Sequence, residues 1–306
     1  MKTILITGGT GLVGTRLTET LLEKDYKVII LSRNKKQSSI KNLQFAQWNI
    51  EKQTIDQWAI EEADCIVHLA GAGVAEERWT KKRKKEIVES RTNSSAIIVW
   101  ALQNISNKVK VVISTSAIGY YGIDTEESFF NGFKESDSFA NNFLGTTCKL
   151  WEESILPVTE LNKRLVIFRV GIVLSNKAGA FTQFTQSLKF KVAAFLGNGK
   201  QILSWIHIDD VCNIYIKAIE DETLSGTYNC VAPNSINNKT LMLKLAKYYC
   251  KNFFIPIYIP AFLIKLMLGD FSVEVLKSTT VSSKKIENTG FQFQYKTIDE
   301  AIENLK

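Results

Sequence analysis

The sequence predicts an α/β protein, in which a doubly wound parallel sheet is followed by a smaller mixed α/β C-terminal region. Three features of the chain predict this class. An apolar stretch rich in β-branched residues opens it, a glycine-rich turn and a helix-like pattern follow, and strand-like and helix-like patterns then alternate through the first 170 residues. Such alternation is typical of parallel strands, because each return to the same edge of the sheet needs a crossover connection, usually a helix. A chain of 306 residues has room for that sheet and a smaller annex.

The first strand and its turn carry the strongest signal. Residues 3–7 (TILIT) have the composition of a buried parallel strand, residues 8–14 (GGTGLVG) form the turn, and leucines recur at helical spacing after it. This order of strand, glycine turn and helix is typical of a pyrophosphate-binding site. Glycine lets the pyrophosphate approach the backbone closely, and the first turn of the helix offers it unpaired N–H groups. We therefore expect a Rossmann-type dinucleotide site, with a purely structural turn as the alternative. The expected contacts come from the strand end and the turn: Thr7, Gly8, Gly11, Leu12, Val13 and Gly14.

The second strand, residues 27–31, ends in a basic segment. In folds of this kind that prefer NAD, an acidic residue about 20 positions after the glycines binds the ribose 2′-hydroxyl. Ser32 and Arg33 stand there instead, and no carboxylate follows them through Lys36. A guanidinium binds a 2′-phosphate through two parallel hydrogen bonds. The sequence therefore predicts NADP(H) in preference to NAD(H), with a solvated basic loop as the alternative.

The third strand is predicted over residues 44–48 and the fourth over residues 64–71. The fourth ends in Leu69, Ala70 and Gly71, and small side chains at a strand end let a cofactor lie against it. His68 is expected to be structural or to meet the cofactor through its backbone. Residues 79–100 predict one long helix. Arg91 on that helix is a candidate for binding a phosphate or carboxylate of the substrate, with a surface arginine as the alternative.

The fifth strand, residues 109–114, leads into a segment rich in hydroxyl groups. Ligands of open α/β sheets bind at the carboxyl ends of the strands. Ser116, Tyr120 and Tyr121 are therefore the candidate catalytic residues. A polar loop and a helix over residues 143–155 come next. The sixth strand follows, and its Arg169 is either an anion anchor for substrate or a structural ion-pair partner.

The character of the chain changes after residue 175. An amphipathic segment ends in the turn signal of residues 197–200 (GNGK), and Asp209 with Asp210 is expected to cap a helix. A late strand is predicted over residues 228–231. Residues 255–259 contain Pro256 and are followed by Pro260, so they are expected to form an extended edge segment. We expect residues 1–170, completed by about 202–231, to form the cofactor-binding core, and residues 171–201 and 232–306 to form the substrate-binding region.

Composition excludes several classes of protein. No apolar run reaches the roughly 18 residues that a membrane span needs, and no signal peptide is recognisable, so a cytoplasmic protein without a membrane partner is expected. The scattered cysteines and the two histidines, His68 and His207, do not match a metal-site pattern. The formal net charge is +7, and part of it sits in residues 81–85 (KKRKK). We interpret that run as a solvated helix face and expect no nucleic-acid partner, because no aromatic-interleaved basic motif accompanies it.

These motifs together resemble the extended short-chain dehydrogenase/reductases, the group of nucleotide-sugar epimerases and dehydratases. The resemblance is closest to an atypical branch labelled only "epimerase family protein", and it covers essentially the whole chain. The matching segments are residues 8–14, 68–71 (HLAG), 78–80 (RWT), 90–91 (SR), Ser116, 119–122 (GYYG), Cys148 with 151–152 (WE), 197–199 (GNG), 205–210 (WIHIDD), 268–269 (LG) and 290–293 (GFQF). The resemblance implies an NADP(H)-binding oxidoreductase or epimerase that acts on a small molecule, such as a nucleotide sugar. It also implies a homodimer through helices at about residues 79–104 and 143–155.

The chain departs from the family at the catalytic pair. Family enzymes carry Tyr-x-x-x-Lys on the helix after strand five, where the tyrosine is the general acid/base and the lysine lowers its pKa and holds the nicotinamide ribose. With Glu152 as the register mark, these positions fall on Leu144 and on Cys148, which is then expected in the cofactor site. Leucine has no transferable proton, and a thiol lacks the charge that depresses a phenol's pKa. Lys149 is one residue late and is turned by about 100° around the helix.

Three hypotheses remain open at this point. The first is an oxidoreductase or epimerase whose proton donor has moved to Tyr121, Tyr120 or Ser116, with Cys148 a weaker candidate. The second is a non-catalytic NADP(H)-binding sensor. The third is a regulatory or protein-interaction role, since this branch is sometimes labelled a cell-division inhibitor.

Overall fold

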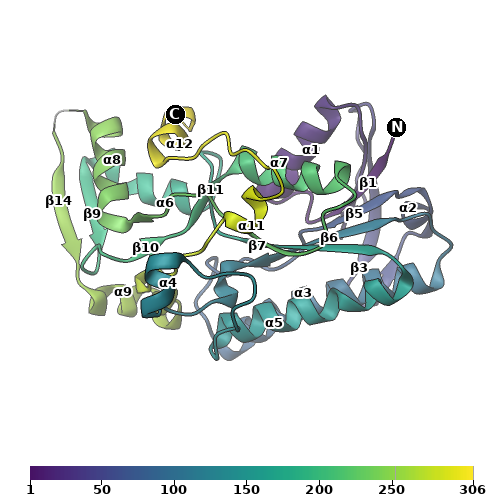
Figure 1. The fold of residues 1–306 in the computed structure, drawn as a ribbon, viewed down its shortest axis with the longest axis horizontal. Helices are drawn as coiled ribbons and strands as arrows, with labels where there is room; N and C mark the ends of the chain where they lie inside the picture. The colour runs from purple at the N-terminus through teal and green to yellow at the C-terminus, as the bar shows by residue number, and fades with distance from the viewer. Residues whose placement is uncertain (252, 306) are drawn as a thin grey trace.

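A computed structural model describes residues 1–251 and 253–305. Its centre is an eight-stranded sheet with the strand order β12-β7-β6-β5-β1-β2-β3-β4 (Figure 1). All neighbouring strands are parallel except β3 and β4. The strands are β1 (Thr3–Thr7), β2 (Lys27–Ser32), β3 (Leu43–Asn49), β4 (Thr54–Ile55), β5 (Cys65–His68), β6 (Val111–Ala117), β7 (Arg164–Val170) and β12 (Gly226–Cys230). The order reverses between β1 and β5, and at such a switch point the loops at the carboxyl ends diverge and leave a crevice.

Helices cover both faces of this sheet (Figure 1). One layer contains α1 (Leu12–Glu23) and α7 (Ile208–Glu220), and the other contains α2 (Gln57–Glu62), α3 (Lys81–Asn104) and α5 (Phe143–Ile155). Successive residues of β1 point to opposite faces, so Ile4 and Ile6 join the core under α1 and α7, whereas Leu5 joins the core under α2, α3 and α5. A strand buried on both sides must be continuously apolar, which explains the sequence of residues 3–7.

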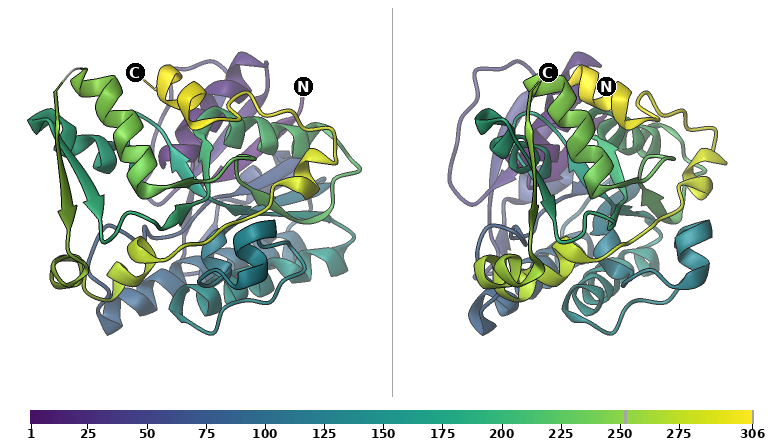
Figure 2. Two further views of the ribbon diagram at one scale, coloured as in Figure 1. Left: turned by 60° about the vertical axis from the view of Figure 1, so that its left-hand side comes forward. Right: turned by 90° about the vertical axis from the view of Figure 1, so that its left-hand side faces the viewer.

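The later segments form smaller units, most of which lie at one end of the molecule, whereas the yellow C-terminal stretch runs back across the molecule (Figure 2). Three two-stranded pairs join β8 (Ile172–Leu174) to β11 (Trp205–His207), β9 (Val192–Leu196) to β14 (Ile255–Ile259), and β10 (Ile202–Leu203) to β13 (Ile236–Asn237). A separate core includes Phe181, Phe195 and Leu245. The helices outside the main layers are α4 (Glu126–Asn131), α6 (Ala180–Gln186), α8 (Asn238–Cys250), α9 (Ala261–Leu268), α10 (Ser272–Leu276), α11 (Lys284–Glu287) and α12 (Ile298–Asn304), with 3₁₀ turns η1 (Ile118–Tyr120), η2 (Leu156–Leu161), η3 (Ser187–Phe190) and η4 (Gly269–Phe271).

The predicted fold class is confirmed, and the predicted strands of the first 170 residues are all present. The long helix begins later than predicted, at Lys81, because the Thr80 side chain caps it by accepting a hydrogen bond from the Arg83 N–H. It also ends later than predicted, at Asn104. The edge segment at residues 255–259 is confirmed as β14. The division into a cofactor-binding core and a substrate-binding region stays a prediction. Over the two described ranges, no helix combines the length and the apolar character that crossing a membrane would require.

The prediction that Asp209 and Asp210 cap α7 was wrong. His207 is the N-cap, and its Nδ1 accepts a hydrogen bond from the Asp209 N–H at 3.2 Å. Asp209 instead pairs with Arg16 on α1 at 2.7 Å. Asp210 is buried and accepts hydrogen bonds from the backbone N–H groups of Gln294 and Tyr295. These partners lie far away in the chain, so the sequence offered no signal for them.

Candidate functional site

The corner between β1 and α1 is built so closely that two of its positions admit only glycine. A Cβ on Gly14 would lie 2.3 Å from the carbonyl oxygen of Gly8. Gly8 has φ +66°, and a Cβ there would lie 2.9 Å from the backbone carbonyl of Leu69. The Gly11 N–H donates to the Gly8 carbonyl at 3.0 Å and closes the turn. The corner is therefore a bare backbone surface beside the end of β5.

The first turn of α1 leaves its N–H groups available to a ligand. Gly11 is the N-cap and provides no side-chain hydrogen bond, and the helix's hydrogen-bond ladder starts with Thr15 N–H to Gly11 O at 2.9 Å. The N–H groups of Leu12, Val13 and Gly14 have no partner within the helix. Free N–H groups and the positive end of the helix dipole favour a phosphate. A dinucleotide pyrophosphate fits this corner, which is where the sequence predicted it.

Thr7 and His68 hold the ends of β1 and β5 together. Thr7 Oγ1 accepts hydrogen bonds from the N–H groups of Leu69 and Ala70, each at 3.1 Å, and lies 2.7 Å from His68 Nδ1. The other ring nitrogen, Nε2, lies 3.2 Å from the Ser95 hydroxyl. Burial lowers the pKa of His68 to about 3, so the ring is neutral. His68 is therefore structural, and Thr7 shapes the segment that faces the glycine turn.

Arg33 lies just past the carboxyl end of β2, the strand that pairs with β1 on the side away from β5. Its side chain is exposed, and its carbonyl accepts a hydrogen bond from Gln47 Nε2 at 3.2 Å. The Asn34 N–H donates to Ser32 Oγ at 3.3 Å and shapes the turn that carries both residues. Arg33 thus stands one strand away from the glycine corner, with its guanidinium open to solvent.

Tyr121 lies deep in the protein. Its side chain is 0% exposed, its hydroxyl donates to Asn229 Oδ1 at 2.7 Å, and it accepts from Arg169 Nη1 at 2.9 Å. Burial is the largest influence on its pKa and raises it well above the ordinary value of 10, although Arg169 acts in the opposite direction. A phenol with these partners and no surface cannot reach a substrate. The structure therefore disfavours Tyr121 as the proton donor.

Arg169 and Ser116 meet at Glu152 on α5. Arg169 forms a two-pronged ion pair, with Nε and Nη2 each 2.8 Å from a Glu152 carboxylate oxygen. Ser116 Oγ donates to the same carboxylate at 2.6 Å, and it too is buried. The arginine stacks over the Tyr120 ring, 3.4 Å from its centroid. Of the two alternatives for Arg169, this geometry supports the structural ion pair, and among the three hydroxyl candidates only Tyr120 keeps partial exposure.

The positions of the missing catalytic pair lie side by side on α5. A Cβ on Gly119 would lie 3.3 Å from the Leu144 side chain and 3.7 Å from Cys148 Sγ, so both residues face η1. Burial raises the pKa of the Cys148 thiol to about 11, which keeps it protonated and weakens it as a nucleophile. Lys149 faces another way and lies 3.5 Å from Glu153. No lysine on α5 therefore replaces the one that is missing at position 148.

Arg91 brings a positive charge to this region from α3. Its guanidinium packs so closely on Gly71 that a Cβ there would lie 3.1 Å from Arg91 Cζ, and it stacks over the Trp151 ring at 4.8 Å. Its Nη1 donates to the Ile87 carbonyl of its own helix. Its charge acts on the pKa of the Cys148 thiol in the lowering direction, against the larger effect of burial. Burial lowers the pKa of Arg91. Across residues 1–251 and 253–305 no carboxylate forms an ion pair with it, which is unusual for a largely buried cation.

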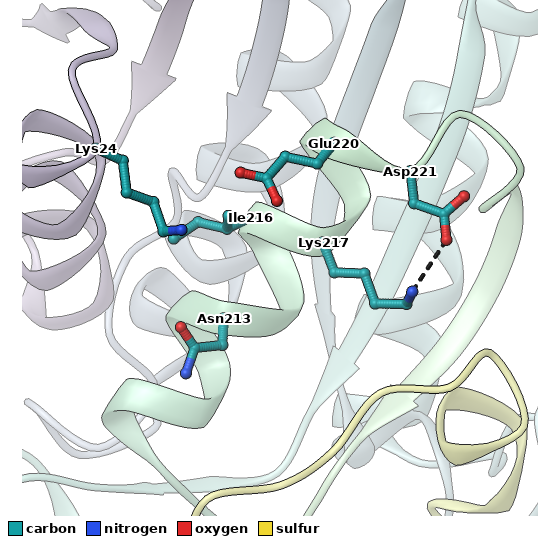
Figure 3. Close-up of a pocket in the computed structure, with 6 residues that line it drawn as sticks. All are labelled: Lys24, Asn213, Ile216, Lys217, Glu220 and Asp221. Atoms are coloured by element: carbon teal, nitrogen blue, oxygen red, sulfur yellow. Dashed lines mark hydrogen bonds and ion pairs between the residues drawn. The ribbon is translucent and has the colours of Figure 1, made fainter.

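A hollow of about 380 Å³ lies elsewhere on the surface (Figure 3). Lys24, which lines it, connects α1 to β2, so the hollow is at the edge where the strands begin, opposite the glycine corner. Its other lining residues include Lys217 and Asp221, which pair at 3.0 Å (Figure 3). This hollow is therefore separate from the predicted site.

Comparison with known protein families gives two matches that together span most of the chain. Residues 4–230 match the model of the NAD dependent epimerase/dehydratase family. Residues 259–305 match a domain of unknown function, DUF1731. The first match covers the main sheet together with β8 to β11, and the second begins at the end of β14.

Relatives with similar sequences extend over the full length. The chain is 32% identical over 302 residues to the epimerase family protein YfhF of Bacillus subtilis, covering 99% of this chain and 97% of the relative. It is 32% identical over 305 residues to the epimerase family protein SSP1921 of Staphylococcus saprophyticus, covering 100% and 99%. Among solved structures, the human epimerase family protein SDR39U1 with NADPH superimposes with a TM-score of 0.85 at 22% identity, over 99% of this chain and 98% of that one.

Proposed function

The chain belongs to the NAD dependent epimerase/dehydratase family, and from that premise we propose that it is an NADP(H)-dependent oxidoreductase or epimerase acting on a small molecule. The observation that carries the proposal is the β1–α1 corner. There, bare glycine backbone, the open N-terminus of α1 and an exposed guanidinium one strand away stand at a single edge of the sheet. The NADPH in the human structural relative supports the same cofactor.

Different residues at this edge bind different parts of the cofactor. The N–H groups of Leu12, Val13 and Gly14 receive the pyrophosphate, and Arg33 pairs with the 2′-phosphate. Ala70 and Gly71 let the nucleoside lie against the end of β5. A bound nicotinamide cofactor supplies hydride transfer, which these residues orient and do not perform.

Arg91 is the residue that we propose in place of the family's lysine. It reaches the neighbourhood of Cys148 from α3, and the lysine would reach the same place from position 148 on α5. A guanidinium there attracts the ribose hydroxyls or a phosphate of the bound cofactor, and the ligand in turn supplies hydrogen-bond acceptors in addition to the Ile87 carbonyl. Tyr120, half-buried in η1 after β6, is the remaining hydroxyl candidate for moving a proton.

Binding is the first test of this proposal. We expect calorimetric titration to give NADPH an affinity at least about tenfold higher than that of NADH, because one charged phosphate contact is worth about 1.4 kcal/mol or more. Equal affinities would reject the NADP(H) preference. An absence of heat and of thermal stabilisation with both nucleotides would reject the cofactor altogether.

A non-catalytic sensor is the second candidate function, and a specific observation favours it. Leu144 occupies the place of the catalytic tyrosine, and Ser116 and Tyr121 are buried in hydrogen bonds with other residues. Two assays separate the functions: NADPH oxidation in stopped flow with a panel of carbonyl compounds, and product analysis for epimers of nucleotide sugars, because an epimerase returns the hydride and consumes no NADPH. Turnover that is lost in Tyr120→Phe supports the enzyme with Tyr120 as its acid, whereas tight NADPH binding without turnover on any compound supports the sensor.

A further inference from the structure

One end of the molecule exposes an unusual amount of apolar surface. On α9, Phe262, Leu266 and Met267 are 69%, 71% and 69% exposed, and only Ile264 is buried. The adjoining strand β14 exposes Ile255, Ile257 and Tyr258, although it has a hydrogen-bonded neighbour, β9, along one edge. We call this surface, together with Phe190 on η3 and Phe253 before β14, the terminal apolar face; its elements lie at the left-hand end of Figure 1. Contiguous exposed apolar side chains of this kind mark an interaction site.

Lysine is the sole charged residue type in the two segments that form this end. Residues 187–206 and 234–269 contain no aspartate, glutamate or arginine. Their charged residues are Lys189, Lys191, Lys200, Lys239, Lys244, Lys247, Lys251 and Lys265. Lys191 lies directly opposite the start of β14, because its carbonyl accepts the Ile255 N–H at 2.8 Å, and Lys265 lies among the exposed side chains of α9. Two carboxylates lie nearby, Asp270 directly after α9 and Asp299, but each is paired with a lysine, Lys84 and Lys244 respectively. Positive charge therefore predominates around the apolar side chains.

This composition distinguishes between candidate partners for the terminal apolar face. A second copy of the chain would bring lysines against lysines, and like charges oppose such contact. Protein interfaces are depleted in lysine and enriched in arginine, the reverse of what is found here. Apolar and aromatic side chains that enter the lipid boundary, with lysines around them, are the pattern of a protein that lies on an anionic membrane.

We propose that the terminal apolar face binds the surface of an anionic phospholipid bilayer, with α9 lying in the interface. The apolar side chains of α9 and β14 enter the headgroup region, and the surrounding lysines contact lipid phosphates. The protein then rests on the membrane without crossing it. The proposal revises the expectation from the sequence that no membrane partner exists, and it is independent of the cofactor and of turnover.

Vesicle sedimentation tests the proposal. The intact protein is mixed with sucrose-loaded vesicles of phosphatidylcholine alone, or of phosphatidylcholine with phosphatidylglycerol. We expect sedimentation with the anionic vesicles, weaker binding at about 0.5 M salt, and little binding to phosphatidylcholine alone. The double variant Phe262→Ser/Leu266→Ser should bind at least about tenfold more weakly, since it removes two of the inserted side chains.

Matched variants separate the membrane from other partners. Phe130→Ser removes a phenylalanine that is 77% exposed on α4, outside the face, and should bind vesicles as the wild type does. Unchanged NADPH affinity and unfolding midpoint in the α9 variant would show that the fold is intact. The proposal is overturned if anionic vesicles do not bind the wild type, or if both variants bind equally. It is also overturned if light scattering shows a dimer that the α9 variant disrupts, because the face then binds a second copy.

Discussion

Arg33 is a single side chain on which the proposed choice between two cofactors depends. It is exposed at the end of β2, beside the glycine corner, in the place where a carboxylate would favour NAD. The sequence was enough to recognise it, because its distance from the glycines along the chain follows from the βαβ unit.

We predict that Arg33→Ala weakens NADPH binding by about tenfold to a hundredfold, because it removes charge-assisted hydrogen bonds worth about 1.5–3 kcal/mol. NADH affinity should not change, since that cofactor has no 2′-phosphate. Lys41→Ala, at an exposed position in the loop after β2, serves as the control, and calorimetry measures both. An equal loss for NADPH and NADH would mean that Arg33 acts on something other than the 2′-phosphate.

Arg91 and Arg169 are both largely buried, yet their surroundings differ. Arg169 has the Glu152 carboxylate, whereas within the described ranges Arg91 has no ion-pair partner. The sequence could not show which of the two arginines has an ion-pair partner, because the side chains around each arginine come from other elements of the fold.

We predict that Arg91→Met lowers NADPH affinity about tenfold and leaves the free energy of unfolding unchanged or higher, because a desolvated cation without a counterion costs stability. Arg91→Lys should keep part of the affinity, since it keeps the charge. Calorimetry and urea unfolding measure the two quantities, with Lys82→Met on the exposed side of α3 as the control. A simultaneous loss of affinity and stability would indicate a structural arginine instead.

At the scale of elements, the glycines in the turn between β1 and α1 differ in how much room each has for a side chain. A Cβ on Gly14 would lie 2.3 Å from a backbone oxygen, whereas a Cβ on Gly11 would lie 3.3 Å from the same atom. A backbone atom cannot move aside as a flexible side chain can. A side chain at Gly14 would therefore force the strand and helix apart, whereas one at Gly11 would not.

We predict that Gly14→Ala costs at least about 2 kcal/mol of stability and abolishes NADPH binding, because the strand and helix must separate. Gly11→Ala should cost less than about 1 kcal/mol, since that contact needs only a small adjustment. Urea unfolding and calorimetry on this matched pair measure the difference. Similar behaviour of the two variants would show that the closeness of the corner is unimportant.

The helix α5 illustrates how far an element can be predicted. Its bounds, Phe143 and Ile155, agree with the sequence-based prediction, and the helical register placed Leu144 and Cys148 together as expected. The partners of its inner face were not predictable. Glu152 served only as a register mark in the sequence, yet in the structure it neutralises Arg169.

At the scale of the whole molecule, His68 makes stability depend on pH. In the folded protein burial holds its pKa at about 3, against an ordinary value of 6.5. Between these values the unfolded chain binds more protons, so the free energy of unfolding falls as the pH is lowered from about 6.5 toward about 3. Above that window His68 adds no pH dependence.

We predict that this loss reaches up to about 1.4 kcal/mol per pH unit from His68 alone. His68→Gln keeps a polar side chain near Thr7 but does not titrate, so its stability should fall less steeply with decreasing pH. Urea unfolding of both proteins at several pH values between about 7 and 5 measures the two slopes, and the carboxylates cancel in the comparison. Identical slopes would contradict a neutral, buried His68.

The sequence by itself determined the parallel sheet, the glycine corner and the place of Arg33, because each depends on neighbours within one βαβ unit and on the periodicity of apolar residues. Only the tertiary structure decided that Tyr121 is buried, that Arg169 is paired and that α9 is exposed. Burial and pairing depend on residues brought together from distant parts of the chain, such as Asn229 beside Tyr121. Local spacing carries no record of such contacts. This is why the glycine corner could be predicted from the sequence, whereas two of the three hydroxyl groups predicted to be catalytic, those of Ser116 and Tyr121, are enclosed by the fold.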